Sequence, residues 1–327
     1  MIPLGTVFRS GTNHSGEIEG TLRAGFQVGV SVCELNVEAV RTLRDCAQAH
    51  PERMLFVDSG AFGEVGWSEA EGRLVVREPI DSGEWCHRLR LYEELAQAWG
   101  HRCLLVCPDL VGDQAGTLAR LKGHGARMQR MADRWGAWLI LPVQRGALSM
   151  TEFAAQAYAA LDRHPRVVWG IPSKKAATSP AELSAFAQSF AEAGHPAPWF
   201  HLLGAVPEMA LWPGRRYLDL LVAVRRHLPD AMVTCDSVRL RALVGRNKGR
   251  GDKPRPLTAA QDAARAQGLT GARAVKRAAV QAVYGAERAH LEAEGTALLK
   301  RIAGLEDELA RAPRQFDFGF TPTRRSA

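Results

Sequence analysis

Four polar side chains stand at the ends of strongly apolar runs in this sequence. Asp58 ends MLFVD, Asp109 ends CLLVCPD, Gln144 ends WLILPVQ and Asp236 ends AMVTCD. Three carboxylates and an amide that meet at one site suit glycosyl chemistry, in which one carboxylate attacks the anomeric carbon and another transfers a proton. The same set suits recognition of a base with amide-like edges, because a carboxylate accepts hydrogen bonds while a glutamine both donates and accepts them.

Two of these aspartates also have purely structural interpretations. Asp58 is followed by Ser59-Gly60-Ala61-Phe62, small residues that are typical of a turn closing a buried strand. Asp236 is followed by Ser237, and this pair often caps a helix at a strand-to-helix turn. Residue type and spacing alone leave both alternatives open.

The elements that would position these residues are apolar runs of strand length. They lie at 26–32, 54–58, 103–109, 138–144, 167–172, 199–205 and 231–236, and a further run at 4–8 would make eight. Amphipathic segments that predict helices separate them, at 37–50, 84–100, 125–136, 150–164 and 179–194. The last of these begins Ser179-Pro180, a capping side chain followed by proline at the first helical position. Continuous apolar strands alternating with such helices predict a parallel sheet covered on both faces.

The spacing of the strand ends is that of βα units. Successive ends from Asp58 to Asp236 lie between 26 and 51 residues apart. Eight such units in about 250 residues predict a (β/α)8 TIM barrel, whose working residues stand at the C-terminal ends of the strands. A doubly wound open sheet is the alternative, although no GxGxxG follows the first strands. We expect the barrel over residues 1–250 and a basic linker with a helical C-terminal extension over 251–327.

Positive charge is concentrated in one stretch of the chain. The net charge is +7, yet residues 239–277 contain eleven Lys or Arg and only two Asp. Clustered cations gain free energy by displacing the counterions of a polyanion, so this block predicts a face that binds nucleic acid. A solvated linker kept soluble by its charge is the alternative.

Composition predicts a soluble, cytoplasmic protein. No apolar stretch reaches the roughly 18 residues that span a bilayer, and the N-terminus lacks the pattern of a signal peptide. The six cysteines form no CxxC pair and are typical of reduced, buried side chains. His101, Cys103 and Cys107 are the one arguable metal cluster, but without paired CxxC knuckles we expect no metal there.

A series of short motifs follows one order through residues 54–250. They are Asp58-Ser59-Gly60-Ala61-Phe62, CPDLVGD around Asp109, LPVQRG around Gln144, VWGIPS around Gly170, Leu203-Gly204-Ala205-Val206, Thr234-Cys235-Asp236-Ser237 and Gly245-Arg246-Asn247. Each motif alone is weak. In this order and spacing they resemble the tRNA-guanine transglycosylase superfamily.

The resemblance implies roles for the two aspartates of the first and last strand motifs. Asp236 would attack C1′ of the target nucleoside, expel guanine and form a covalent glycosyl–enzyme intermediate. Asp58 would act as the general acid toward the leaving guanine and then as the base toward the incoming base.

The resemblance also implies a base-binding pocket. Asp109 would accept hydrogen bonds from the N1 and N2 donors of guanine, while Gln144 and the backbone of Gly170 would serve the O6 side. Phe62 and Leu203 would clamp the flat base between an aromatic and an apolar face, unless either is plain core. Ser59 and Gly204 complete the set of expected substrate-binding residues.

One departure from the family bears on the substrate. The tRNA enzymes carry a zinc site of three cysteines and a histidine after the nucleophile, whereas no cysteine follows Cys235 here and the only later histidine is His290. We therefore expect no zinc site and no other cofactor. Zinc-lacking relatives with a DSGAF-like motif and a PD-x-x-GD segment are similar to the DpdA-type DNA-guanine transglycosylases, which replace guanine in DNA with a 7-deazaguanine, typically 7-cyano-7-deazaguanine (preQ0).

The expected partners are accordingly DNA and a free 7-deazaguanine base, and no membrane. A tRNA substrate and a catalytically silent, nucleic-acid-binding subunit are the alternatives. A base in a duplex has to be flipped out of the stack before a buried pocket reaches its C1′. Because they follow the predicted nucleophile directly, Arg239, Arg241, Arg246 and Lys248 are the expected phosphate contacts.

Overall fold

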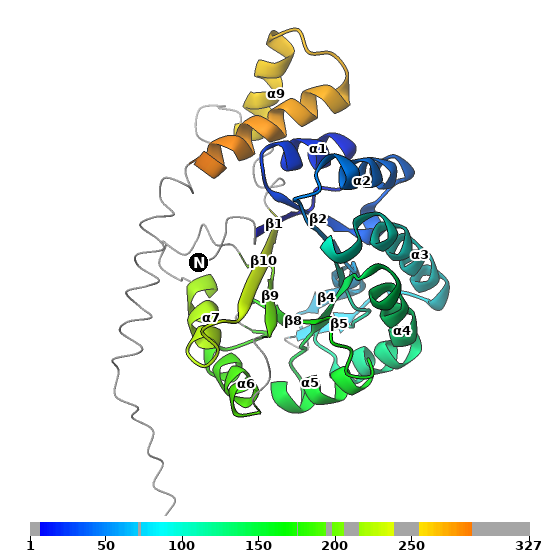
Figure 1. Cartoon of the computed structure of the whole chain (residues 1–327), viewed down its shortest axis with the longest axis vertical. Coiled ribbons are helices and arrows are strands. Elements are labelled where there is room, and N and C mark those ends of the chain that lie inside the picture. Colours follow the sequence, from blue (N-terminus) through cyan, green and yellow to red (C-terminus); the bar gives the residue numbers. More distant parts are fainter. Residues whose placement is uncertain are drawn as a thin grey trace, which may run out of the picture.

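Eight parallel strands close into a barrel in the computed structural model, which describes residues 7–70, 73–174, 176–193, 198–205, 216–238 and 255–289 (Figure 1). The strands are β1 (Val7–Ser10), β2 (Gln27–Ser31), β3 (Leu55–Asp58), β6 (Cys103–Val106), β7 (Trp138–Pro142), β8 (Val167–Pro172), β9 (Trp199–Leu203) and β10 (Met232–Val238). Their order around the barrel is β1-β10-β9-β8-β7-β6-β3-β2, with every neighbouring pair parallel. The predicted (β/α)8 barrel is confirmed, and the seven main apolar runs each overlap one of its strands.

Helices surround the barrel in the order that βα units require (Figure 1). They are α1 (Ser15–Arg23), α2 (Val37–Ala49), α3 (Ser82–Trp99), α4 (Gln114–Trp135), α5 (Met150–Ala159), α6 (Pro180–Glu192) and α7 (Arg216–Arg225). Ser179 caps α6 as predicted, with Glu182 closing a reciprocal capping box. Asp113 caps α4 through the Gly116 amide, so this helix begins well before the expected residue 125.

A small excursion between β3 and α3 was not predicted from the sequence. The chain forms a short 3-10 helix (Ala61–Glu64) and then the antiparallel pair β4 (Val65–Ser68) and β5 (Arg73–Val76). Strands of four residues contain too few alternations to be recognised from a pattern of period two. This hairpin lies over the end of the barrel at which β3 ends.

Alternate side chains of the strands build two separate layers of core. Those that point inward include Phe8, Phe56, Ile140, Val168 and Trp199, which pack together inside the barrel. Those that point outward join the helices in a larger core. Asp58 follows Phe56 by two residues and therefore faces the barrel interior, because side chains on a strand alternate between faces.

The C-terminal segment packs beside α1 (Figure 1). It consists of α9 (Pro256–Ala266) and a second helix over residues 272–289. This second helix crosses α1 closely, since a Cβ on Gly16 or Gly20 would lie 2.6 Å from a carbonyl oxygen of Arg273 or Arg277, respectively. Behind this crossing, Tyr284 packs edge-on against Phe26 within a small separate core.

Ion pairs reinforce the same contact. Lys276 reaches Glu17 at 2.9 Å, and Arg273 reaches Glu19 at 2.5 Å and Glu38 at 3.2 Å. These cations were counted in the basic block of residues 239–277, but acids on α1 and α2 neutralise them. A net charge read from sequence contains no information about which cations are already paired.

Candidate active site

The predicted site residues gather at one end of the barrel. Asp58 ends β3, Leu203 ends β9 with Gly204 directly after it, and Asp236 lies in β10. Asp109 and Gln144 follow the ends of β6 and β7. All of these positions are at the C-terminal ends of parallel strands, which is where barrel enzymes assemble their sites.

Asp236 is held by one of its two carboxylate oxygens. The residue lies within β10 and is 7% exposed, so it does not cap a helix. Its Oδ1 accepts a hydrogen bond of 2.7 Å from the Gly204 amide, and His201 Nε2 lies 3.4 Å from the same oxygen. Among the described residues, Oδ2 has no hydrogen-bond partner. The carboxylate is therefore oriented through Oδ1 while Oδ2 is available for chemistry.

Asp58 combines the geometry of a turn residue with a raised pKa. Its Oδ2 accepts hydrogen bonds from the Gly60 amide at 3.0 Å and from the Ser31 hydroxyl at 3.4 Å, an arrangement typical of a turn aspartate. Desolvation at the barrel mouth and the nearby Asp236 carboxylate raise its pKa to about 6. A carboxyl group with that pKa can both give and take a proton near neutrality. The structural and the chemical interpretations of Asp58 thus hold together.

The turn after Asp58 depends on Gly60. Its φ of +72° is in the left-handed region, and a Cβ there would lie 2.6 Å from the Cys33 sulfur. Phe62 follows this turn and is 60% exposed, which excludes the alternative that it is plain core. An exposed aromatic ring beside a polar site is available for stacking, so its role against a base stays a prediction.

Asp109 is the centre of a buried hydrogen-bond network. Ser59 Oγ donates to its Oδ1 at 3.0 Å, and Gln144 Nε2 donates to its Oδ2 at 2.7 Å. The Gln144 Oε1 in turn accepts from the Gly112 amide at 3.0 Å. Burial, followed by the charge of Asp58, raises the pKa of Asp109 to about 7. Two of the predicted base-binding residues, Ser59 and Gln144, therefore hydrogen-bond to a third, Asp109, and a base would share or replace these hydrogen bonds.

A buried ion pair that was not predicted from the sequence supports this network. Glu64, at the end of the 3-10 helix, is 1% exposed and bonds to both terminal nitrogens of Arg120 on α4, at 2.6 and 2.5 Å. Arg120 also donates to the carbonyl oxygen of Asp109, and Glu64 accepts from the Ile80 amide at 2.9 Å. The pair ties the β4–β5 excursion to Asp109. No local sequence pattern connects two residues that are 56 positions apart.

The two remaining base-pocket residues have less distinctive surroundings. The carbonyl of Gly170 accepts from the Val143 amide at 2.8 Å, and a Cβ on this glycine would lie 2.8 Å from Ile140 Cγ2. Leu203 is partly buried and packs against the inner barrel core. Their predicted contacts with a base stay predictions.

His201 is a second residue of the site that was not predicted from the sequence. It is fully buried on β9 and stacks on Phe56, with ring centroids 4.8 Å apart and planes 13° apart. Its Nδ1 lies 2.8 Å from the hydroxyl oxygen of Thr234. A signal was present in the sequence: an ionisable residue inside the apolar run WFHLLGA, two positions before Leu203 and hence on the same face of the strand.

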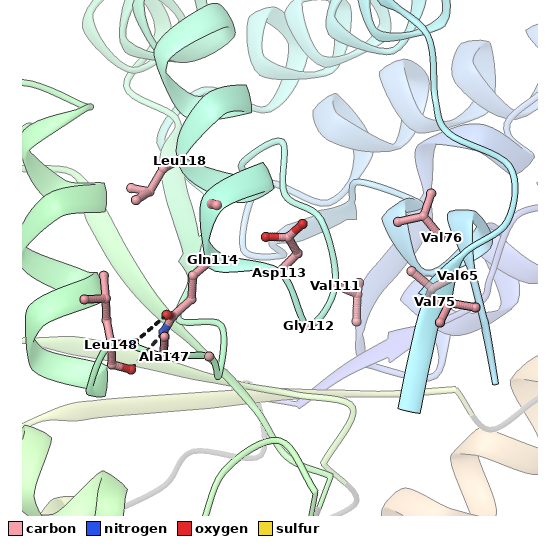
Figure 2. A pocket seen from close by; sticks show the side chains of 12 residues that line it. Val65, Val75, Val76, Val111, Gly112, Asp113, Gln114, Leu118, Ala147 and Leu148 are labelled. Atoms are coloured by element: carbon pink, nitrogen blue, oxygen red, sulfur yellow. Dashed lines mark hydrogen bonds between the residues drawn. The ribbon is translucent and has the colours of Figure 1, made fainter. Parts of the chain in front are cut away.

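An open groove of about 660 Å³ lies beside this network (Figure 2). Its walls come from the β4–β5 hairpin, the start of α4 and the loop after β7. The lining residues are Val65, Val75, Val76, Val111, Gly112, Asp113, Gln114, Ala115, Leu118, Gly146, Ala147 and Leu148. None of the predicted catalytic or base-binding residues lines it, so the groove adjoins the carboxylate site without containing it.

The described residues include the arguable metal ligands but not the expected phosphate contacts. In the part of the chain that the structure describes, no three His, Cys, Asp or Glu side chains come together in a way that could hold a metal ion. Cys103 and Cys107 are buried, which raises the pKa of both thiols and disfavours the thiolate that a metal needs, and His101 is exposed. The expected phosphate contacts Arg239, Arg241, Arg246 and Lys248 lie outside the described residues.

Comparison with known proteins adds no family. No protein-family model and no curated protein matches this chain. Within the described ranges, no helix has both the length and the apolar character needed to cross a membrane.

Proposed function

We propose that this protein is a base-exchange transglycosylase that replaces guanine in DNA with a 7-deazaguanine, through a covalent ester on Asp236. The observation that carries the proposal is the contrast between two neighbouring carboxyl groups. Asp236 is fixed through Oδ1 by the Gly204 amide, whereas the pKa of Asp58 is raised to about 6. Such a pair supplies a nucleophile and a proton shuttle at one site.

The geometry supports a two-step exchange. In the first step Oδ2 of Asp236 bonds to C1′ and the bond from C1′ to the purine nitrogen breaks, while Asp58 gives its proton to the departing guanine. In the second step a 7-deazaguanine gives a proton to Asp58 and attacks C1′, and the ester oxygen returns to Asp236 as a carboxylate. Each step leaves Asp58 ready for the next one.

Asp109 and Gln144 support recognition of one base edge in both steps. Guanine and 7-deazaguanines such as preQ0 present the same donors at N1 and N2, which a buried carboxylate accepts. Since this edge is common to both bases, one pocket releases the first and admits the second. The exposed ring of Phe62 is available to cover the face of the base.

The choice of DNA over tRNA rests on the resemblance and on the missing zinc ligands. The chain has no cysteine after Cys235, so the donor set of the family's zinc site does not fit this sequence. Free cysteines throughout the described part of the molecule fit the reducing cytoplasm, where we place the reaction.

A parallel exchange assay tests the proposal. Duplex DNA, single-stranded DNA and tRNA, each carrying radiolabelled guanine, are incubated with unlabelled preQ0, and release of the label is counted. We expect release from DNA, its loss in Asp236→Ala, and normal release in the control Asp113→Asn. That control removes a carboxylate from the same end of the barrel and keeps a good helix cap on α4.

Each other outcome has a defined meaning. Release from tRNA alone would establish the tRNA alternative and contradict the DNA assignment. Binding of nucleic acid without release from any substrate would support the catalytically silent subunit instead. Release that persists in Asp236→Ala would contradict the assigned nucleophile.

A further inference from the structure

His201 lies on the floor of the site, in a position fixed from several sides. The side chain is 0% exposed and is the stacking partner of Phe56, while the ring of Phe8 lies 5.8 Å away. All three side chains point into the barrel from different strands. The imidazole plane therefore has little freedom, and the direction of its two nitrogens is set by packing.

The hydrogen bonds of Thr234 determine which imidazole nitrogen carries the proton. The Trp199 indole N–H, which can only donate, gives its hydrogen to Thr234 Oγ1 at 2.9 Å. The hydroxyl has one hydrogen of its own, and the nearer acceptor is His201 Nδ1 at 2.8 Å, against 3.4 Å for the Phe200 carbonyl oxygen. The shorter distance favours Nδ1 as the acceptor, and in that arrangement a neutral ring carries its proton on Nε2.

That proton faces the predicted nucleophile. His201 Nε2 is 3.4 Å from Asp236 Oδ1 and makes no hydrogen bond within the described residues. A buried N–H group without a partner is unfavourable and uncommon in proteins. Here it lies beside the same oxygen that already receives the Gly204 amide.

We propose that His201 is a positioning residue for Asp236: the Gly204 amide holds Oδ1 in the free enzyme, and the adjacent Nε2–H of His201 completes a hydrogen bond to the same oxygen as the ester forms, so that Oδ2 is the atom that bonds to C1′. The inference rests on the proposed base exchange. When the ester forms, Oδ2 gains the bond to C1′ and Oδ1 becomes the ester carbonyl. The purine leaves with the electron pair of the C1′–N bond and takes its proton from Asp58.

A neutral imidazole suits this role better than a permanent cation would. Two neutral donors orient a carboxylate without forming the close ion pair that would weaken it as a nucleophile. In the ester, the same donors stabilise the carbonyl oxygen, and a small rotation of the carboxyl group would shorten the 3.4 Å separation to a normal hydrogen bond. The unused donor in the free enzyme is then used in the intermediate.

The tautomer itself is measurable without any activity. In protein carrying 15N-labelled histidine, two-bond 15N–1H correlation spectra distinguish a ring protonated on Nε2 from one protonated on Nδ1. The His201 signals are assigned by their absence from His201→Gln. We expect the proton on Nε2, and a shift of that signal in Asp236→Asn. A neutral ring with its proton on Nδ1 would overturn the inference, because such a ring has no donor to offer Oδ1.

A pair of substitutions tests the positioning role in the reaction. His201→Leu removes the donor, and we expect adduct formation in single turnover to slow about 10- to 100-fold, since a misplaced reacting group costs rate on that scale. Binding of DNA should be unchanged. His201→Gln offers an amide N–H near the position of Nε2 and should recover about tenfold of that rate. Equal rates for the Gln and Leu variants, with both folded by circular dichroism, would contradict the inference.

The two measurements separate this inference from the proposed function. An Nε2-protonated ring in a protein that exchanges no base would leave the contact with Asp236 in place and overturn the reaction. Base exchange by a protein whose His201 is protonated on Nδ1 would keep the reaction and overturn the role of His201.

Discussion

Asp58 and Asp109 are carboxyl groups whose pKa values the barrel mouth raises to near neutrality. The values of about 6 and about 7 have the same leading cause, which is removal of the carboxylate from water. The second cause is mutual repulsion, of Asp58 by Asp236 and of Asp109 by Asp58. Proximity of three like charges is unfavourable for a folded protein, and such arrangements are typical of functional sites.

The first prediction at this scale is a pH dependence of guanine release. As a general acid, Asp58 has to be protonated, and that form disappears as the pH rises through about 6. Above that pH the single-turnover rate of release should fall about tenfold per pH unit. Asp58→Asn should abolish this dependence and slow release by about 10² to 10⁴. An unchanged pH profile in Asp58→Asn would exclude Asp58 as the proton donor.

A second prediction concerns the stability of the protein without substrate. The pKa of Asp109 is higher in the folded chain, about 7, than its ordinary value of 3.8, so the folded state binds this proton more tightly than the unfolded state. Its contribution to stability therefore falls as the pH rises from about 4 to about 7, and the reduced stability persists at higher pH.

Asp109→Asn removes the carboxyl group and with it the free-energy cost of burying its charged form. At pH 8 we expect its free energy of unfolding to exceed that of the wild type by ~1–4 kcal/mol, the upper value corresponding to the full difference in pKa. At about pH 4 the two proteins should be similar. Urea unfolding at both values checks this, together with loss of guanine binding by the variant. A variant that is no more stable at pH 8 would show that the carboxyl group carries no such penalty.

At the scale of elements, the contact between α1 and the helix over residues 272–289 is a close approach of two helices that glycine permits. Gly20 faces the Arg277 carbonyl oxygen at 2.6 Å and Val280 Cβ at 2.8 Å, measured from an ideal Cβ. A methyl group has no space there unless the helices move apart. The acid–base pairs around this crossing would lengthen at the same time.

Gly20→Ala should therefore destabilise the protein, by ~1–3 kcal/mol, the usual cost of overpacking. Gly285→Ala is the matched control, because Gly285 lies in the same C-terminal helix with nothing within 4 Å of an added Cβ. Alanine there should raise stability by up to ~1 kcal/mol through helix propensity. Thermal unfolding of both variants checks the pair. Equal stability of the two variants would mean that the helices do not approach as described.

Some elements were predictable from sequence, and the reasons are physical. Buried parallel strands are continuous apolar runs, so the seven main runs gave the positions of seven barrel strands. The polar residues at the ends of these runs pointed to the site. The hairpin β4–β5 was too short to show a period. The segments of α1 and α7 were not recognised as helices, and α1 carries Gly16 and Gly20, which a helix pattern disfavours.

Within the site, single residues were easier to locate from sequence than their partners. The strand-end rule found Asp58, Asp109, Gln144 and Asp236 because each follows an apolar run. It had no means of pairing Glu64 with Arg120, or of connecting His201 through Thr234 to the strand that contains Asp236. Those contacts are set by how strands and helices come together in the barrel.

At the scale of the whole molecule, several cations of the basic block are already paired with acids, and a paired cation is less available to bind a polyanion. Of the cations between 255 and 289, Arg265, Arg273, Lys276 and Arg277 are paired with acids. The other cations of the basic block lie at 239–255, and those at 239–253 follow β10 directly in the sequence, outside the described residues. We predict that the proposed binding of nucleic acid depends on that stretch.

The salt dependence of DNA binding tests this division. Replacing Arg239, Arg241, Arg246 and Lys248 with glutamine should weaken binding and reduce the slope of log K against log salt by up to about 0.9 for each phosphate that is no longer neutralised. Lys276→Gln, which removes a cation already paired with Glu17, is the control and should leave the slope unchanged. A fourfold variant with the wild-type slope would remove this stretch from the DNA interface.

Locating the covalent intermediate is the most direct test of Asp236 as the nucleophile. The protein is mixed with guanine-containing DNA in the absence of any incoming base, denatured, digested with nuclease and protease, and examined by mass spectrometry. We predict a deoxyribosyl ester on the peptide that contains Thr234-Cys235-Asp236-Ser237, at Asp236, and its absence from Asp236→Asn. A nucleoside adduct on another residue, or base exchange with no adduct at Asp236, would contradict this assignment.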